Sequence, residues 1–186
     1  ISPLDGHTGL DDGQELECSK KYSVTIPGKK QTKYVLIPGC TVPASFPELV
    51  EETYSHMKET LGEDNVGIIL QCCAKPTEII GETKLFEERY SRVQKEIDEI
   101  EADVIVTLCP SCYLTYEKYS GRKVISYWDL MKEEIGIPKN QKDVGKDSDV
   151  IFNIHDSCPT RYVTSHHDSV RWILSQLGYK LSLIHI

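Results

Sequence analysis

Five of the seven cysteines in this 186-residue chain fall into three short groups that together form a set of soft metal ligands. The groups are Cys40, Cys72-Cys73 and Cys109-Pro110-Ser111-Cys112. Thiolates bind zinc and the iron of iron–sulfur clusters. Five cysteines exceed the four ligands of a closed zinc site, and two adjacent cysteines can reach different metal atoms. If the fold brings the groups together, this donor set favours an iron–sulfur cluster.

Each cysteine group directly follows a short apolar run with the length and β-branched content of a buried strand. The runs are YVLIPG (34–39), VGIILQ (66–71) and DVIVTL (103–108), with helix-like sequence between them. Strands that alternate with helices predict βαβ units, and hence an α/β fold with a Rossmann-like parallel sheet and helices on both faces. Because parallel strands end at the same edge of a sheet, we expect the five thiols to meet there.

The remaining elements follow from apolar periodicity and from glycine and proline punctuation. Ser126-Tyr127-Trp128-Asp129 resembles a capping box that opens a short helix to Ile135. The other predicted helices cover residues 43–61, 83–101, 110–119 and 160–177, and further strands cover 22–26, 123–128, 149–156 and 179–186.

The cysteine spacing, C-x31-C-C-x35-C-x-x-C, resembles the cysteine-rich CCG domain of heterodisulfide reductase catalytic subunits. The same domain occurs in glycolate oxidase and lactate-utilisation iron–sulfur subunits. The matching segments read IPGC, QCCAKP and TLCPSC, with Ala74 in place of the family's usual glycine. In those reductases five such cysteines hold a non-cubane [4Fe–4S] cluster that cleaves a disulfide by one-electron chemistry. The resemblance implies the same role for Cys40, Cys72, Cys73, Cys109 and Cys112, and a flavoprotein or ferredoxin-like redox partner.

These observations predict an iron–sulfur cluster-binding domain of an electron-transferring oxidoreductase, with the substrate left open. The alternative is a non-catalytic module that carries electrons or zinc. An open iron site beside a cavity favours the enzyme, whereas a sealed and thiolate-saturated site favours the module. A structural zinc site and a thioredoxin-like dithiol of Cys109 and Cys112 also remain open, although the dithiol leaves three cysteines without a purpose. Because such clusters are oxygen-labile, an aerobically purified chain can be empty.

Cys158 predicts a second copy of the motif. FNIHDSCPTRY (152–162) repeats the pattern of VLIPGCTVP (35–43): an apolar strand, a turn, a cysteine, a proline and a helix. In tandem members of the family the HDxC form opens the second copy, so we expect Cys158 to be an orphan ligand of an incomplete second site, near the first by pseudo-symmetry. His155 and Asp156 either shape that site or form the turn and cap the next helix.

The predicted organisation is therefore a fragment of a longer oxidoreductase. An extended lead-in (1–33) precedes the first CCG domain (34–135), a polar linker (136–148) and the truncated start of a second CCG domain (149–186).

Composition excludes several other functions. The net charge of −8 and the lack of dense basic runs make nucleic acid an unexpected partner. No apolar stretch approaches the roughly 18 residues of a membrane span. Seven cysteines in a chain of this length do not resemble a secreted disulfide scaffold, so we expect a reducing, cytoplasmic setting. Cys18 is expected to be a non-ligand, and His56, His166 and His167 are expected to face solvent.

Overall fold

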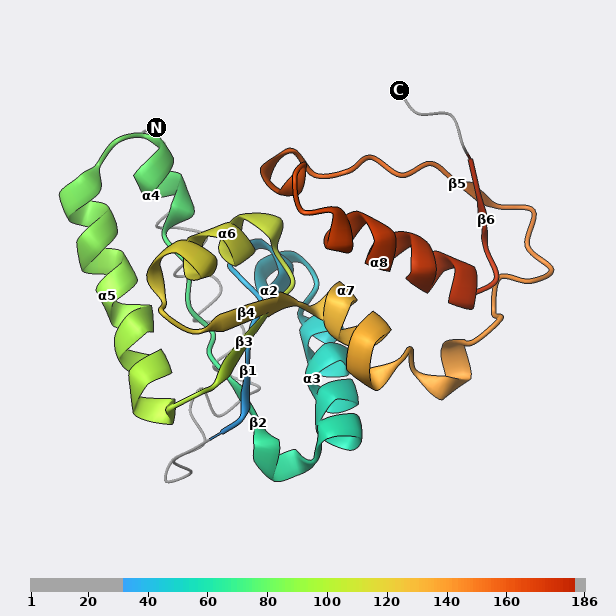
Figure 1. Cartoon of the computed structure of the whole chain (residues 1–186), viewed down its shortest axis with the longest axis horizontal. Coiled ribbons are helices and arrows are strands. Elements are labelled where there is room, and N and C mark those ends of the chain that lie inside the picture. The colour runs from blue at the N-terminus through green and yellow to red at the C-terminus, as the bar shows by residue number, and fades with distance from the viewer. Residues whose placement is uncertain (1–31, 183–186) are drawn as a thin grey trace. The chain divides into compact units, whose positions relative to one another are not determined.

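The computed structural model describes residues 32–182, which fall into two compact units (Figure 1). The first unit ends at Ile125 and the second begins at Ser126, ten residues before the predicted end of the first CCG domain. The predicted strand at 22–26 and Cys18 lie outside the described residues. No helix in residues 32–182 is long and apolar enough to cross a membrane.

The first unit is built on a four-stranded parallel sheet in the order β2-β1-β3-β4. Its strands are β1 (Tyr34–Ile37), β2 (Val66–Ile68), β3 (Val104–Thr107) and β4 (Lys123–Ser126). Every residue of β1, β2 and β3 is buried, as expected for strands that are covered on both faces. The predicted α/β fold with a parallel sheet is therefore confirmed.

Helices cover both faces of this sheet (Figure 1). The helical elements of the unit are α2 (Thr41–Ser45), α3 (Pro47–Leu61), η1 (Glu63–Asn65), α4 (Lys75–Ile79), α5 (Thr83–Ile100) and α6 (Pro110–Tyr119). On one face, Val35 and Ile105 of the sheet pack with Ile97 of α5 and Tyr116 of α6 in one apolar cluster. On the other face, the Tyr54 hydroxyl of α3 donates to the Val66 carbonyl over 3.3 Å. The sheet is thus the middle layer of three.

The helix predicted over residues 43–61 is broken into α2 and α3 at Phe46, whose φ of −141° and ψ of 63° are not helical. Pro47 follows directly, and a proline ring disfavours the helical conformation of the residue before it. The prediction for His56 is also wrong, because this residue of α3 is only 8% exposed. Burial lowers the pKa of His56, which favours the neutral imidazole.

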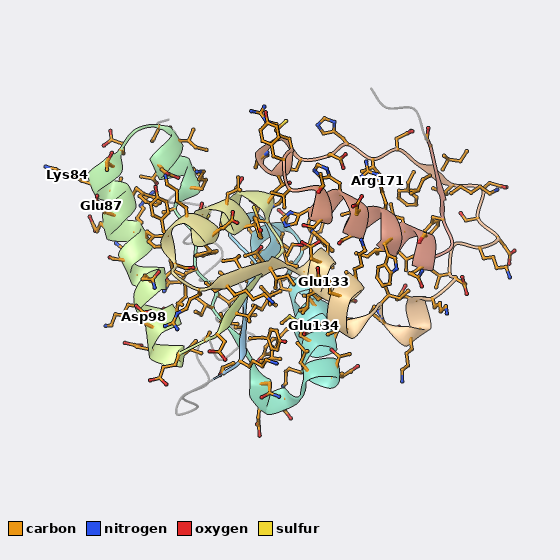
Figure 2. All side chains as sticks on the ribbon, in the orientation of Figure 1. Lys84, Glu87, Asp98, Glu133, Glu134 and Arg171 are labelled. Carbon is orange, nitrogen blue, oxygen red and sulfur yellow. The ribbon has the colours of Figure 1, made fainter. Side chains whose placement is uncertain are left out.

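Helix α5 matches the prediction closely. It buries Phe86, Tyr90, Val93, Ile97 and Ile100 on its inner face. Lys84 and Glu87 are exposed on the outer side of α5 (Figure 2), and Asp98 is exposed and accepts a hydrogen bond from Arg122 over 3.2 Å. This arrangement agrees with a solvated charged face rather than a set of acid–base catalysts.

The second unit has one long helix and a two-stranded parallel sheet. Its elements are α7 (Tyr127–Leu130), η2 (Met131–Ile135, a π-helical turn), η3 (Lys139–Gln141), β5 (Ile151–Phe152), η4 (Cys158–Thr160), α8 (Thr164–Gln176) and β6 (Lys180–Leu181). The Ser126 hydroxyl accepts the N–H of Asp129 over 3.0 Å, so the cap predicted from the sequence is present. The predicted fifth strand is much shorter than expected, since pairing with β6 covers two residues.

A buried carboxylate joins the helices of the second unit. Asp129 of α7 accepts hydrogen bonds from the hydroxyls of Ser169 (2.6 Å) and Ser165 (3.4 Å), and its Oδ2 lies 3.2 Å from His166 Nε2. His166 is 5% exposed, so its predicted place on the surface is wrong. Ser169 follows His166 by three residues on α8, so both side chains share the helix face that meets Asp129.

Replacing Asp129 with alanine is expected to loosen α8. The change leaves buried donors without their acceptor, which costs about 1–3 kcal/mol for each such group. Hydrogen exchange of the amides of residues 164–176 should become faster, and exchange reports such local loss of stability. The matched control is Glu133→Ala, which removes the same charge from an exposed residue (Figure 2). Equal acceleration in both variants would show that the buried contacts of Asp129 contribute nothing.

Candidate metal centre

The strand order of the first unit changes direction next to the cysteine groups. The chain passes from β1 to β2 on one side and then crosses to β3 on the other side of β1. Ligands of open parallel sheets bind at such a switch point, beyond the carboxyl ends of the strands. Cys40 follows the end of β1 by three residues, and Cys109 follows the end of β3 by two. The first and third cysteine groups therefore follow the two strands that flank this switch point.

The side chains of the five cysteines are neighbours in one continuous line. Its order is Cys40, Cys72, Cys73, Cys112 and Cys109, because each of them affects the pKa of the next. Cys112 Sγ donates to Cys73 Sγ over 3.3 Å. Cys72 also interacts with Cys40, so the vicinal pair connects the first cysteine group to the third. The structure thus brings together all five cysteines that the sequence analysis selected for this site.

Proton sharing along this line divides the thiols into donors and acceptors. Hydrogen bonds from Cys72 to Cys40 and from Cys112 to Cys73 lower the pKa of the two accepting thiols. Interaction with the Cys112 side chain is the largest of the effects that lower the pKa of Cys109, to about 6. The same bonds raise the pKa of the donors, Cys72 and Cys112. Cys40, Cys73 and Cys109 therefore ionise more readily than Cys72 and Cys112, and the thiolate is the form that binds metal.

Backbone N–H groups add to this effect at two turns. Cys109 is the N-cap of α6, and the N–H groups of Ser111 and Cys112 help to lower its pKa. The N–H of Lys75, at the start of α4, does the same for Cys73. Both helices thus direct their first amides at a sulfur of the site.

Two residues next to the cysteines, one before Cys40 and one after Cys73, have a positive φ. Gly39 has a φ of +88°, and a Cβ built there would lie 3.1 Å from Cys112 Sγ and 3.4 Å from Cys109 Cβ. Ala74 has a φ of 57° and a ψ of 14°, the left-handed helical region that glycine occupies without strain. Glycine, which the domains that the motif resembles usually carry at this position, would adopt this conformation without strain. Ala74 adopts it at a cost of about 1–2 kcal/mol.

Several polar residues around the site belong to no recognisable sequence motif, so the sequence analysis did not select them. Gln71 precedes the vicinal pair, and its side-chain amide donates to Glu96 of α5. Thr107 ends β3 and is 1% exposed. Within the described residues, no hydrogen-bond partner faces the hydroxyls of Thr107 or Tyr116. The apolar periodicity of β3 and α6 predicts burial at these positions but does not show where their hydroxyls point.

Glu78 links α4 to α6 beside the cysteines. Its carboxylate accepts from Lys75 Nζ (2.6 Å), the Tyr119 hydroxyl (2.6 Å) and Lys118 Nζ (3.2 Å). Burial would raise the pKa of Glu78, but the three hydrogen bonds lower it to about 2. The ionised carboxylate therefore stabilises the folded unit.

The contribution of Glu78 is expected to disappear in acid. Its folded pKa lies below the ordinary value of 4.5, so the stabilisation is complete above pH 4.5 and is lost as the pH falls towards 2. Solvent screening reduces it to about 1 kcal/mol at pH 7. In urea unfolding, Glu78→Gln should therefore have a lower free energy of unfolding than the unsubstituted chain at pH 7. The two free energies should converge near pH 2. Glu87→Gln, at an exposed position of α5 (Figure 2), should show no such difference at any pH.

Cys158 lies in the second unit, and it is exposed and not disulfide-bonded. Asp156 accepts two hydrogen bonds from the Arg171 guanidinium, over 2.9 and 2.8 Å. Neither η4 nor α8 has a side-chain cap, so Asp156 acts through this ion pair rather than as a helix cap. The role of Cys158 in a second site stays a prediction.

The donor set fits a metal group, but the sulfur positions differ from those of a bound ion. Within residues 32–182, no three His, Cys, Asp or Glu side chains already surround a point where a metal ion would sit. Four thiolates on one zinc ion lie about 3.8 Å apart, given a Zn–S bond of about 2.3 Å. The 3.3 Å between Cys73 and Cys112 is shorter because these sulfurs share a proton. Binding a metal therefore requires proton loss and a small separation of the sulfurs.

Comparison with known proteins agrees with this geometry. Residues 34–117 match the family model CCG, described as a cysteine-rich domain, and the match contains all three cysteine groups. No curated protein and no solved structure matches the chain. The match confirms the resemblance drawn from the cysteine spacing and indicates a metal-binding role. Residues 34–117, somewhat less than half of the chain, are therefore similar to the CCG cysteine-rich domain.

Proposed function

We propose that the first unit binds a [4Fe–4S] cluster, of the non-cubane type by resemblance, and serves an electron-transferring oxidoreductase related to heterodisulfide reductase. The observation that carries this proposal is the continuous line of five cysteines beyond the carboxyl ends of β1 and β3. Cys40, Cys72, Cys73, Cys109 and Cys112 would be the ligands. Five thiols exceed the four that a zinc ion accepts, whereas a cluster offers several iron atoms.

The five cysteines would ionise at different stages of cluster binding, and nearby backbone amides would stabilise their charge. Cys40, Cys73 and Cys109 already have lowered pKa values, so they supply thiolates with little loss of free energy. Cys72 and Cys112 are buried and would release their protons when metal binds. When bound, an iron–sulfur cluster accepts and donates single electrons. The amides at the starts of α4 and α6 would then compensate part of the negative charge of the thiolates.

The five cysteines differ in their exposure to solvent. This difference helps to choose between a catalytic oxidoreductase and a non-catalytic carrier module. Cys40 and Cys109 are partly exposed at the two ends of the line, whereas Cys72, Cys73 and Cys112 are at most 5% exposed. Partly exposed ends leave a side from which a substrate disulfide or a redox partner can approach. This favours the oxidoreductase over a sealed carrier module. A flavoprotein or ferredoxin-like partner in the cytoplasm is part of the same proposal.

Anaerobic reconstitution with ferrous iron and sulfide tests the proposal. We expect about four iron atoms and four inorganic sulfides per chain, and an electron paramagnetic resonance signal in one redox state, as for the cluster type proposed. A parallel sample with zinc alone should bind less tightly. One tightly bound zinc ion per chain, with no uptake of iron and sulfide, would contradict the proposal and support the structural zinc site.

A further inference from the structure

Tyr116 carries a buried hydroxyl that the folded chain leaves without a partner. The residue lies in α6 and its side chain is 0% exposed. Within residues 32–182, no group forms a hydrogen bond with its hydroxyl. Buried tyrosine hydroxyls are normally paired, because an unpaired one costs about as much as a lost hydrogen bond. An exception in an otherwise well-packed core points to an acceptor that arrives with a ligand.

Several observations place the side chain of Tyr116 near the cysteines. Tyr116 follows Cys112 by four residues on α6, so both occupy the same helix face. Long side chains in a helix lean towards its N-terminus, and here that end carries the CPSC motif. Tyr116, Cys112 and Cys73 also belong to one buried cluster.

The electrostatics of Tyr116 agree with this placement. Burial raises the pKa of its phenol, and the electrostatic influence of the nearby cysteines acts in the same direction. The phenol therefore keeps its proton and acts as a donor. Thr107, whose hydroxyl also lacks a described partner, shares the sheet face of Ile105, because alternate residues of a strand point to the same side.

We propose that the Tyr116 hydroxyl donates a hydrogen bond to a sulfur of the cluster that the five cysteines bind, and so raises the reduction potential of that cluster. This inference rests on the proposed function. Hydrogen bonds to the sulfurs are one of the factors that set the potential of an iron–sulfur cluster. A donor stabilises the reduced form more than the oxidised form, because reduction adds negative charge to the sulfurs. Tyr116 is thus a positioning and tuning residue rather than a ligand.

Tyr116→Phe removes the hydroxyl and leaves the ring, and Tyr90→Phe is the matched control. The Tyr90 hydroxyl donates to Gln94 Oε1 over 3.1 Å, and its ring packs 6.2 Å from that of Tyr116. Each variant thus loses one hydroxyl group, and both hydroxyl groups belong to the same aromatic cluster. The two hydroxyls differ in their pairing, since that of Tyr90 already has an acceptor within the protein.

Two measurements on the full chain test the proposal. In the iron-free protein, Tyr116→Phe should melt at the same or a higher temperature than the unsubstituted chain, and Tyr90→Phe should melt lower. In the reconstituted protein, Tyr116→Phe should bind the same amount of iron. Its reduction equilibrium constant should fall about tenfold, about 59 mV for one electron. Tyr90→Phe should keep the original potential.

The outcomes separate this inference from the proposed function. Failure of the unsubstituted chain to bind iron would overturn both. Normal iron binding with equal potentials in Tyr116→Phe and the unsubstituted chain would overturn only the role of Tyr116. A lower melting temperature of iron-free Tyr116→Phe would also overturn it, because the hydroxyl would then have a partner without the cluster.

Discussion

Replacing Cys73 with serine is expected to abolish most of the iron uptake of the reconstituted chain. Cys73 lies in the middle of the line of sulfurs, with Cys72 on one side and Cys112 on the other. A hydroxyl replaces a thiolate poorly as a ligand of cluster iron. The loss of affinity should exceed the roughly 10- to 100-fold that removal of an outer hydrogen-bonding partner of a metal site costs. Iron and sulfide analysis after anaerobic reconstitution measures the effect.

Cys158→Ser is the matched control for this experiment. It makes the same chemical change at an exposed cysteine of the other unit. Iron content should stay at the level of the unsubstituted chain, and Cys18→Ser is expected to behave in the same way. Equal iron loss in all three variants would indicate general misfolding, and the assignment of ligands would lose its support.

Replacing Gly39 with alanine is expected to destabilise the first unit and to reduce its iron uptake. The φ of +88° costs an alanine about 1–2 kcal/mol. The new methyl group would also lie 3.1 Å from Cys112 Sγ, closer than ordinary contact. Overpacking of this kind costs about 1–3 kcal/mol more, and it would displace a sulfur of the site. Urea unfolding and iron analysis measure the two effects.

Gly81→Ala separates backbone strain from crowding. Gly81 has almost the same φ, +86°, but no described atom lies within 4 Å of the position that its Cβ would take. This variant should therefore show the strain of about 1–2 kcal/mol alone and should bind iron normally. If both variants lost equal stability and iron, close packing of Gly39 against the cysteines would be irrelevant to the site.

The sequence predicts the positions of the cysteines well because a parallel sheet leaves little choice. A thiol directly after a buried strand must lie at the carboxyl edge, whatever the details of the loops. The proton sharing within the site was not predictable in this way. It depends on which sulfurs approach each other, and the strand pattern does not contain that information.

Two errors in the sequence analysis concern histidines whose side chains are buried. His56 and His166 were both expected to face solvent. His166 is buried because Asp129, 37 residues earlier, provides a partner within the second unit. The unpaired hydroxyl of Tyr116 was missed for a related reason. Its position four residues after Cys112 was the one available signal.

The odd number of thiols in the line limits what oxidation can do to the metal-free site. Disulfides consume sulfurs in pairs, so five thiols form at most two bonds and always leave one sulfhydryl. A bond within Cys72-Cys73 is strained, which leaves Cys40–Cys72 together with either Cys73–Cys112 or Cys109–Cys112. The remaining thiol is then Cys109 or Cys73, and in the reduced site hydrogen bonds lower the pKa of both. Oxidation of the metal-free site therefore always leaves a free sulfhydryl there, on the partly exposed Cys109 or on the buried Cys73.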